Sequence, residues 1–351
     1  MANNKKVMKF SSEETSVFCE QIAMLLNSGI PLYEGIYMLY SEMEEKKTKN
    51  ILEQLEKSLR GNTTLYDSLV KTQAFPEYMV HMVKVGETTG KLEEVMKSLA
   101  DYYERESEVK TSIKSAITYP AVLFAMMSVI IMVLVFKILP MFELMFFELN
   151  SEVADTTKSM MNYGIVVGKV IAILTFVAFV VFIIVLCWYK TKKGERKLRS
   201  FMMNFRLTKK LSEAMAVGKF ISSMALMINS GIEMPRALDI SYNASSHRKV
   251  KEKIKQCKSL IDKNVSLEEA IHETRLLIGM ESQLITVAAK TGASDTAFEK
   301  LSVQYNTRIT GMLHKLSTTI ETILVVSLAV LIGSVLISVM LPLVSMISSI
   351  G

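Results

Sequence analysis

Two kinds of hydrophobic pattern alternate along the chain. In residues 1–118 and 190–319, apolar residues recur at helical spacing, and short polar segments separate them. Three other stretches, at 119–140, 163–189 and 320–348, are almost wholly apolar, and each can cross about 30 Å of hydrocarbon as a helix. The pattern predicts an all-α protein with two tandem cytosolic bundles of the six-helix type and three transmembrane helices.

Turn residues mark the expected helix ends in the first bundle. A first helix is expected from Ser12 to Ser28, because Gly29 suits the left-handed position that closes many helices. Pro31 suits the first turn of the next helix, where its missing N–H has no partner to lose. Further breaks are expected at 60–62, 75–76 and 86–90.

A long helix is expected after these breaks, from Lys91 to Ile117. It leads directly to the first apolar stretch, where Pro120 is expected to kink it at the edge of the bilayer.

Basic residues beside the apolar stretches set the expected orientation. Lys110 and Lys114 precede the first stretch, and the basic run 190–200 follows the second, so both sides should be cytosolic. The connector 141–162 is short and mostly acidic, and we expect it outside. The first eighteen residues lack the apolar core of a secretory signal. These features predict a cytosolic N-terminus and an external C-terminus.

The chain contains an internal repeat at an offset of 202 residues. The sequence Asn-Ser-Gly-Ile occurs at 27–30 and again at 229–232. Without any gap, Thr89-Gly90 then matches Thr291-Gly292, and Leu139-Pro140 matches Leu341-Pro342. Three matches so far apart, at one offset, indicate duplication of a unit that consists of a bundle and a membrane helix. The second apolar stretch lies between the two copies.

Charge and candidate chemistry narrow the classes of function. The 351 residues carry a net charge of +6, but the basic residues gather at membrane boundaries or mix with acids, so direct nucleic-acid binding is not expected. The three Cys and four His residues show no metal-ligand spacing, and 86–92 lacks the spacing of a phosphate loop. We therefore expect no catalytic, cofactor-binding or metal-binding residues.

A transporter or channel subunit and a membrane-bound enzyme are two other classes of membrane protein to compare with this sequence. A transporter or channel subunit needs polar groups along its path, whereas the ionisable residues of these stretches lie near their ends. A membrane-bound enzyme would need a catalytic motif, and none is recognised in the sequence.

The chain resembles the F-domain platform proteins of type II secretion and type IV pilus machines over nearly its whole length. The resemblance rests on the two tandem domains, the three-stretch layout and four short motifs. These motifs are the L-x-x-G-I-P-L-like segment at Leu26–Leu32, V-G-E-x-x-G-x-L at Val85–Leu92, Tyr119-Pro120, and L-P-x-F at Leu139–Phe142.

The resemblance implies a non-enzymatic platform in the bacterial cytoplasmic (inner) membrane that couples a cytosolic hexameric secretion ATPase to filament assembly. The implied partners are that ATPase, pilin or pseudopilin subunits, other inner-membrane assembly proteins, further copies of the chain in a homo-oligomer, and membrane lipid. No cofactor is implied. Pilus, secretion and DNA-uptake machines all remain open.

Two groups of residues become candidate sites on this basis. The candidate partner-contact residues are Gly86, Glu87, Thr89 and Gly90, and the candidate membrane-junction residues are Tyr119, Pro120, Pro140 and Pro342. The alternative for Glu87 is that its charge is favourable near the N-terminus of the long helix. The second copy has Ala289 in the place of this acid, so a contact made by Glu87 is not expected to recur there.

Overall fold

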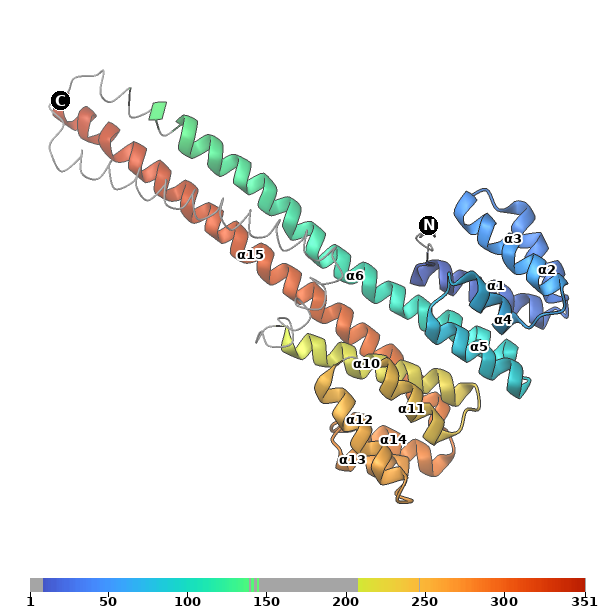
Figure 1. The fold of residues 1–351 in the computed structure, drawn as a ribbon. Helices are drawn as coiled ribbons and strands as arrows, with labels where there is room; N and C mark the ends of the chain where they lie inside the picture. The colour runs from blue at the N-terminus through green and yellow to red at the C-terminus, as the bar shows by residue number, and fades with distance from the viewer. Residues whose placement is uncertain (1–8, 139, 142–143, 145–207, 246, 351) are drawn as a thin grey trace, which may run out of the picture. The chain divides into compact units, whose positions relative to one another are not determined.

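The computed structural model describes residues 9–138, 140–141, 144, 208–245 and 247–350 (Figure 1). These residues are almost entirely helical, and the described ranges contain no strand, as expected of an all-α protein. The first copy contains α1 (Ser12–Asn27), α2 (Leu32–Glu42), α3 (Lys46–Arg60), α4 (Leu65–Thr72), α5 (Glu77–Thr89), α6 (Leu92–Val133) and a π-helical segment, η1 (Leu134–Ile138). The second contains α10 (Lys209–Asn229), α11 (Met234–Ala244), α12 (Arg248–Ile261), α13 (Leu267–Glu273), α14 (Met280–Thr291) and α15 (Ser294–Ile350).

The two copies repeat the same helices at the same spacing. The second, third, fourth and sixth helices of the copies begin 202 residues apart. Gly29 and Gly231 both take the left-handed conformation after the first helix of their copy. The predicted first helix is confirmed, while Pro31 stands at the N-cap of α2, one residue before its expected place. The prediction of six helices in each bundle is also confirmed.

Contacts divide the chain into two units. One unit contains the bundle helices, Met1–Thr111 together with Arg206–Thr310, and the other contains Ser112–Phe205 and Gly311–Gly351. In the first unit a single hydrophobic core runs through both bundles. Its fully buried side chains include Ile22, Leu55, Leu69 and Met79 from the first copy and Ile221, Ile254, Ile271 and Phe298 from the second.

Polar caps hold the ends of the bundle helices. Ser11 and Glu14 form a capping box at α1, in which each side chain bonds the backbone N–H of the other residue. Lys47 of α3 lies 2.6 Å from the Glu14 carboxylate. Although partial burial acts to raise the pKa of Glu14, the bonds from Lys47 and Ser11 outweigh it and hold that pKa below its usual value.

The long helices α6 and α15 lie side by side in the second unit (Figure 1). Each continues from its bundle into an apolar segment that is long enough to span a membrane. The expected helix from Lys91 to Ile117 is thus part of a longer one, because α6 begins at Leu92 and is helical through Pro120 as far as Val133. Pro120 lacks an N–H and removes one helical hydrogen bond, yet the helix continues on both sides of it.

One more helix, α10, is long and apolar enough to cross a membrane by length and composition alone. Its most apolar window is 56% buried inside the protein, because α10 is buried on several faces in the first unit. A helix that is apolar around most of its circumference fits the interior of a protein as well as a bilayer. The predicted second span, 163–189, and nearly all of the connector 141–162 lie outside the described residues.

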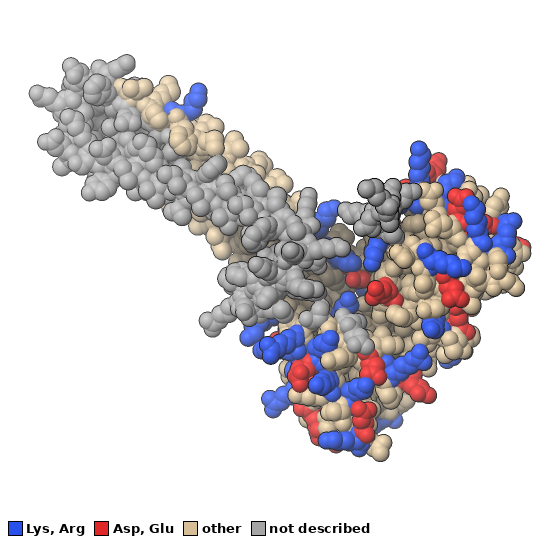
Figure 2. All heavy atoms as spheres, in the orientation of Figure 1, with Lys and Arg blue, Asp and Glu red and all other residues tan. Residues whose placement is uncertain are grey.

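The surfaces of the two units differ in their content of charged side chains. Lys, Arg, Asp and Glu are interspersed over the visible surface of the bundles, whereas the described part of α6 beyond them is nearly uncharged in this view (Figure 2). Exposed apolar side chains follow one another along this part of α6, among them Val122, Met126, Val129 and Val133. Such a surface requires an apolar environment, which a lipid bilayer provides.

Candidate functional site

Glu87 caps the start of a neighbouring helix. Its carboxylate accepts hydrogen bonds from the backbone N–H groups of Leu65, at 2.6 Å, and Tyr66, at 3.2 Å. These are the first two residues of α4, whose N–H groups have no partner within the helix. The carboxylate also opposes the positive end of the α4 dipole. The helix end that this charge serves therefore belongs to α4, and not to the long helix α6.

The two glycines around Glu87 have different structural roles. Gly86 allows α5 and α6 to approach closely, because a Cβ there would lie 3.1 Å from the Cα of Leu92 and from the side chain of Val95. Gly90 has a φ of 70° and closes α5, while the N–H of Lys91 bonds the Gly86 carbonyl at 2.9 Å. The expected break over 86–90 is thus wrong in extent, since the helix continues to Thr89.

The second copy keeps this turn without its acid. Gly292 closes α14 in the same left-handed conformation, and the N–H of Ala293 bonds the Ala288 carbonyl at 2.9 Å. Ala289, at the position of Glu87, has no group that can cap α13. The packing between the two helices also differs. Ala288 on α14 is larger than its counterpart Gly86, and Ala297 on α15 is smaller than its counterpart Val95, so the total side-chain volume at this contact changes less than either residue alone.

The described residues of the predicted junction lie on or beside the long helices. Tyr119 of α6 donates a hydrogen bond to the Glu321 carboxylate of α15 at 3.2 Å. These two residues are 202 positions apart, so they are equivalent in the two repeats. Pro120 lies within α6, Pro140 follows η1, and Pro342 lies within α15. The structure brings Tyr119 and Glu321 together, and sequence reasoning did not anticipate this pairing.

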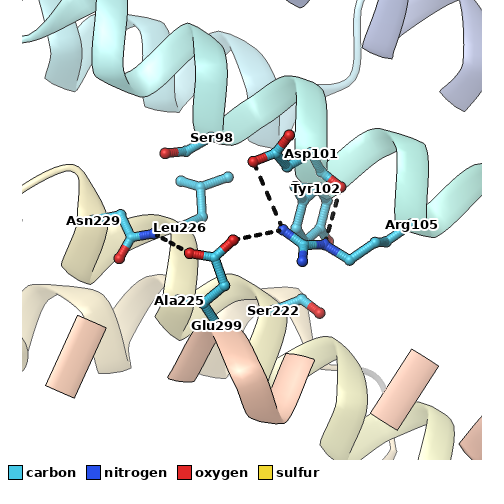
Figure 3. Close-up of a pocket in the computed structure, with 9 residues that line it drawn as sticks. All are labelled: Ser98, Asp101, Tyr102, Arg105, Ser222, Ala225, Leu226, Asn229 and Glu299. Carbon is cyan, nitrogen blue, oxygen red and sulfur yellow. Dashed lines mark hydrogen bonds and ion pairs between the residues drawn. The ribbon is translucent and has the colours of Figure 1, made fainter. Parts of the chain in front are cut away.

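A polar cluster joins the bundles inside the first unit (Figure 3). The Arg105 guanidinium of α6 lies 4.0 Å from the Asp101 carboxylate and 3.9 Å from the Glu299 carboxylate of α15. Asn229, at the end of α10, donates to Glu299 at 3.5 Å. Burial raises the pKa of Asp101, the Arg105 charge opposes that rise, and Glu299 adds to it.

The hollow at this cluster is too small for a substrate. Its enclosed space is about 10 Å³, roughly what a single water molecule requires. Small-molecule sites usually enclose at least about 300 Å³. The cluster therefore acts as a contact between bundles and does not form a ligand pocket.

The buried Tyr78 and Tyr102 lie at the same contact, and Tyr103 lies beside Tyr102. The rings of Tyr78 and Tyr102 lie 5.1 Å apart, and Tyr102 makes an edge contact of 5.1 Å with Tyr103. Burial raises the pKa of all three phenols, and the Ser223 hydroxyl of α10 partly opposes that rise at Tyr78. Tyr78 of the first bundle thus lies near Ser223 of the second, and the phenols stay neutral at physiological pH.

Comparison with known proteins gives the fold a family. The family of type II secretion system (T2SS) protein F matches residues 18–140 and again 220–342. The chain belongs to this family. The two matches begin and end 202 residues apart, which confirms the duplication expected from the sequence.

Curated relatives cover nearly the whole chain. It is 25% identical to the type IV pilus assembly protein PilC of Thermus thermophilus over 97% of this chain and 84% of the relative. It is 26% identical to the PilC of Myxococcus xanthus, over 94% and 79%. It is 22% identical to the type II secretion system protein F of Xanthomonas campestris, over 95% and 83%. Relatives from both pilus and secretion machines therefore match it.

Sequence reasoning missed the contact between the bundles. Asp101, Arg105 and Glu299 belong to no motif, and their meeting depends on the packing of distant helices. Differences between the repeats could have indicated this contact, because equivalent positions of the two copies carry different residue types there. Asp101 corresponds to Val303, and Leu226 of α10 corresponds to Met24 of α1.

Proposed function

We propose that this chain is the membrane platform of a type IV pilus or type II secretion machine, with no catalytic activity of its own. The observation that carries the proposal is the double family match, in which each copy joins a charged helical bundle to an apolar segment. The names of the relatives, pilus assembly protein and secretion system protein F, support the same class of machine.

In this proposal the platform couples a cytosolic hexameric secretion ATPase to the assembly of pilin or pseudopilin filaments. The 42 residues of α6 and the 57 of α15 are continuous helices of about 63 and 85 Å at 1.5 Å per residue. A continuous helix can carry a displacement from a bundle to the membrane without a flexible joint. The remaining proposed partners are other inner-membrane assembly proteins, lipid and further copies of the chain.

The proposed placement follows from charge and hydropathy. Segments 119–140, 163–189 and 320–348 cross the cytoplasmic (inner) membrane, while bundles 1–118 and 190–319 face the cytosol. The N-terminus is then cytosolic, and the connector 141–162 and the C-terminus are external. The interspersed charges on the bundles and the basic residues beside the spans support this orientation.

The turn after α5 stays the proposed contact for a partner. Thr88, Thr89 and Gly90 are exposed there, although the Glu87 carboxylate is already bonded to α4. A partner can therefore meet the exposed backbone and hydroxyl groups of the turn, while Glu87 keeps α4 in place beside it.

Copurification tests the proposal. The full chain, tagged and solubilised in mild detergent, is mixed with the hexameric secretion ATPase of the same cell. We expect the ATPase to be recovered with the tagged chain. In a control purification without the chain, we expect no ATPase to be recovered. Failure to recover any secretion ATPase with the intact chain would overturn the coupling role.

A further inference from the structure

The two bundles share one fold but bury different surfaces. On α5, Met82 is 0% and Val85 is 6% exposed, whereas their counterparts on α14, Leu284 and Val287, are 37% and 59% exposed. Tyr102 of α6 is buried, whereas its counterpart Gln304 of α15 is exposed. Because the bundles have the same helices at the same spacing, the additional cover on the first bundle comes from outside that bundle.

The opposite difference appears on the first helix of each copy. Leu226 of α10 is 3% exposed, whereas its counterpart Met24 of α1 is 59% exposed. Ser223 and Ser230 lie one turn before and one turn after Leu226, and both are buried. On α10 an entire face is thus covered, and on α1 the same face is open.

The contact between the bundles accounts for both differences. Residues of α6 and α10 line the same small hollow, and Arg105 of α6 lies 3.9 Å from Glu299 of α15. The Lys91 side chain lies against the turn after α10, where a Cβ on Gly231 would be 2.6 Å from its Nζ. The α5/α6 face of the first bundle therefore packs on the α10 face of the second.

This contact joins different faces of the two repeats. Within one chain, the α5/α6 face and the α10 face cover each other. The equivalent faces of the other copies, α14/α15 in the second bundle and α1 in the first, stay exposed. Contacts between unlike faces can be repeated from molecule to molecule in a head-to-tail manner.

We infer that a second copy of this chain packs its α1 face on the α14/α15 face of the first copy, as α10 packs on α5/α6 within one chain. The open faces consist of Met280, Leu284, Val287, Val303 and Gln304 on one side and Gln21, Met24 and Asn27 on the other. The inference deepens the self-association in the proposed function by naming its surfaces.

The side chains at the equivalent positions suit each other. Ser98 and Ser222 line the hollow inside the chain, and their counterparts are Lys300 and Glu20. Between two chains these positions therefore bring together a cation and an anion. Lys97, the counterpart of Glu299, lies at the same equivalent hollow and faces the position of Thr307, which carries no charge. Exposed apolar residues at 280, 287 and 303 supply area that is best removed from water.

Directional cross-linking tests this arrangement on the purified full-length chain. Cys19, Cys187 and Cys257 are first replaced by Ala, and two differently tagged variants are made, Met24→Cys and Val303→Cys. Both positions are at least half exposed, so neither substitution disturbs the core. The pair Asp101→Cys and Leu226→Cys in one chain, at the equivalent positions beside the same hollow, calibrates the reach of the cross-linker.

The expected result is a cross-link between the two tags only when the two variants are mixed. Cross-linking of either variant to itself would indicate a two-fold contact and overturn the inference. The inference would also be overturned if the mixture gave no cross-link under conditions in which the calibration variant reacts. Cross-linking of the open faces only to an added ATPase would also overturn it. Because no ATPase or pilin is needed, a failure here is distinct from failure of the coupling role.

Charge exchange gives a second readout. Lys300→Glu is expected to weaken the association about two- to fivefold, the range for an exposed ion pair, and Glu20→Lys in the partner copy is expected to restore it. Native mass spectrometry measures the association, and circular dichroism checks that each variant is folded. A weakening that Glu20→Lys fails to restore would contradict the pairing of these two positions.

Discussion

The Glu87 carboxylate lies 2.6 Å from the backbone nitrogen of Leu65, so the acid of the V-G-E turn holds the first turn of α4. This relationship gives a structural reason for an acid at a position proposed as a partner contact. The same side chain can stabilise the bundle whether or not a partner binds beside it.

Removing this cap is expected to destabilise the first bundle. Glu87→Ala should lower the free energy of unfolding by about 1–2 kcal/mol, because two N–H groups of α4 lose their acceptor. Glu87→Gln, which keeps one acceptor oxygen, should cost about half as much. Denaturation followed by circular dichroism measures both. Ala289→Gln in the second copy is the matched control and should change stability by less than about 0.5 kcal/mol.

A second comparison separates capping from partner contact. Thr64→Ala removes the side-chain cap of the same helix, since the Thr64 hydroxyl accepts the Asp67 N–H at 3.0 Å. If Glu87 acts only on α4, Thr64→Ala and Glu87→Ala should weaken ATPase recovery equally. If the Glu87 carboxylate itself also meets the ATPase, the loss of recovery should be larger for Glu87→Ala than for Thr64→Ala. Equal recoveries would remove Glu87 from the proposed contact.

Close packing at Gly86 gives a sharper stability test. Gly86→Ala should cost about 1–3 kcal/mol, because the added Cβ would press on Leu92 and Val95 at 3.1 Å. Adding Val95→Ala copies the pairing of the second bundle, Ala288 with Ala297, and should recover part of the loss. Gly311→Ala is the control, since a Cβ there meets nothing within 4 Å and α15 gains a better helix former. Equal losses at 86 and 311 would contradict this account.

Much of the fold could be predicted from the sequence because its signals are local. Helical spacing, the glycines after the first helices and the 202-residue offset are all confirmed. The sequence did not predict the extent of α5, because Gly86 and Gly90 suggested a break over 86–90. A glycine is needed at position 86 because α6 packs closely against it. The acceptor role of Glu87 and the Arg105 cluster involve residues far apart in sequence, so no local pattern revealed them.

The raised pKa of Asp101 makes stability depend on pH. The folded state favours the protonated acid, so the contribution of this residue to stability falls as pH rises from the unfolded pKa through the folded one. Asp101→Asn should therefore raise the unfolding midpoint at pH 7 and leave it almost unchanged at pH 3. Thermal unfolding at both pH values measures the difference. A lower midpoint for Asp101→Asn at pH 7 would show that the Arg105 contact outweighs burial.

We propose that this chain connects a cytosolic ATPase to filament assembly in the membrane. This role is tested by the amount of filament subunit that can be sheared from the surface of cells that lack the chain but still make the ATPase and the subunits. Surface filaments are expected to disappear from these cells and to return when the intact chain is supplied. Undiminished filaments without the chain would contradict it.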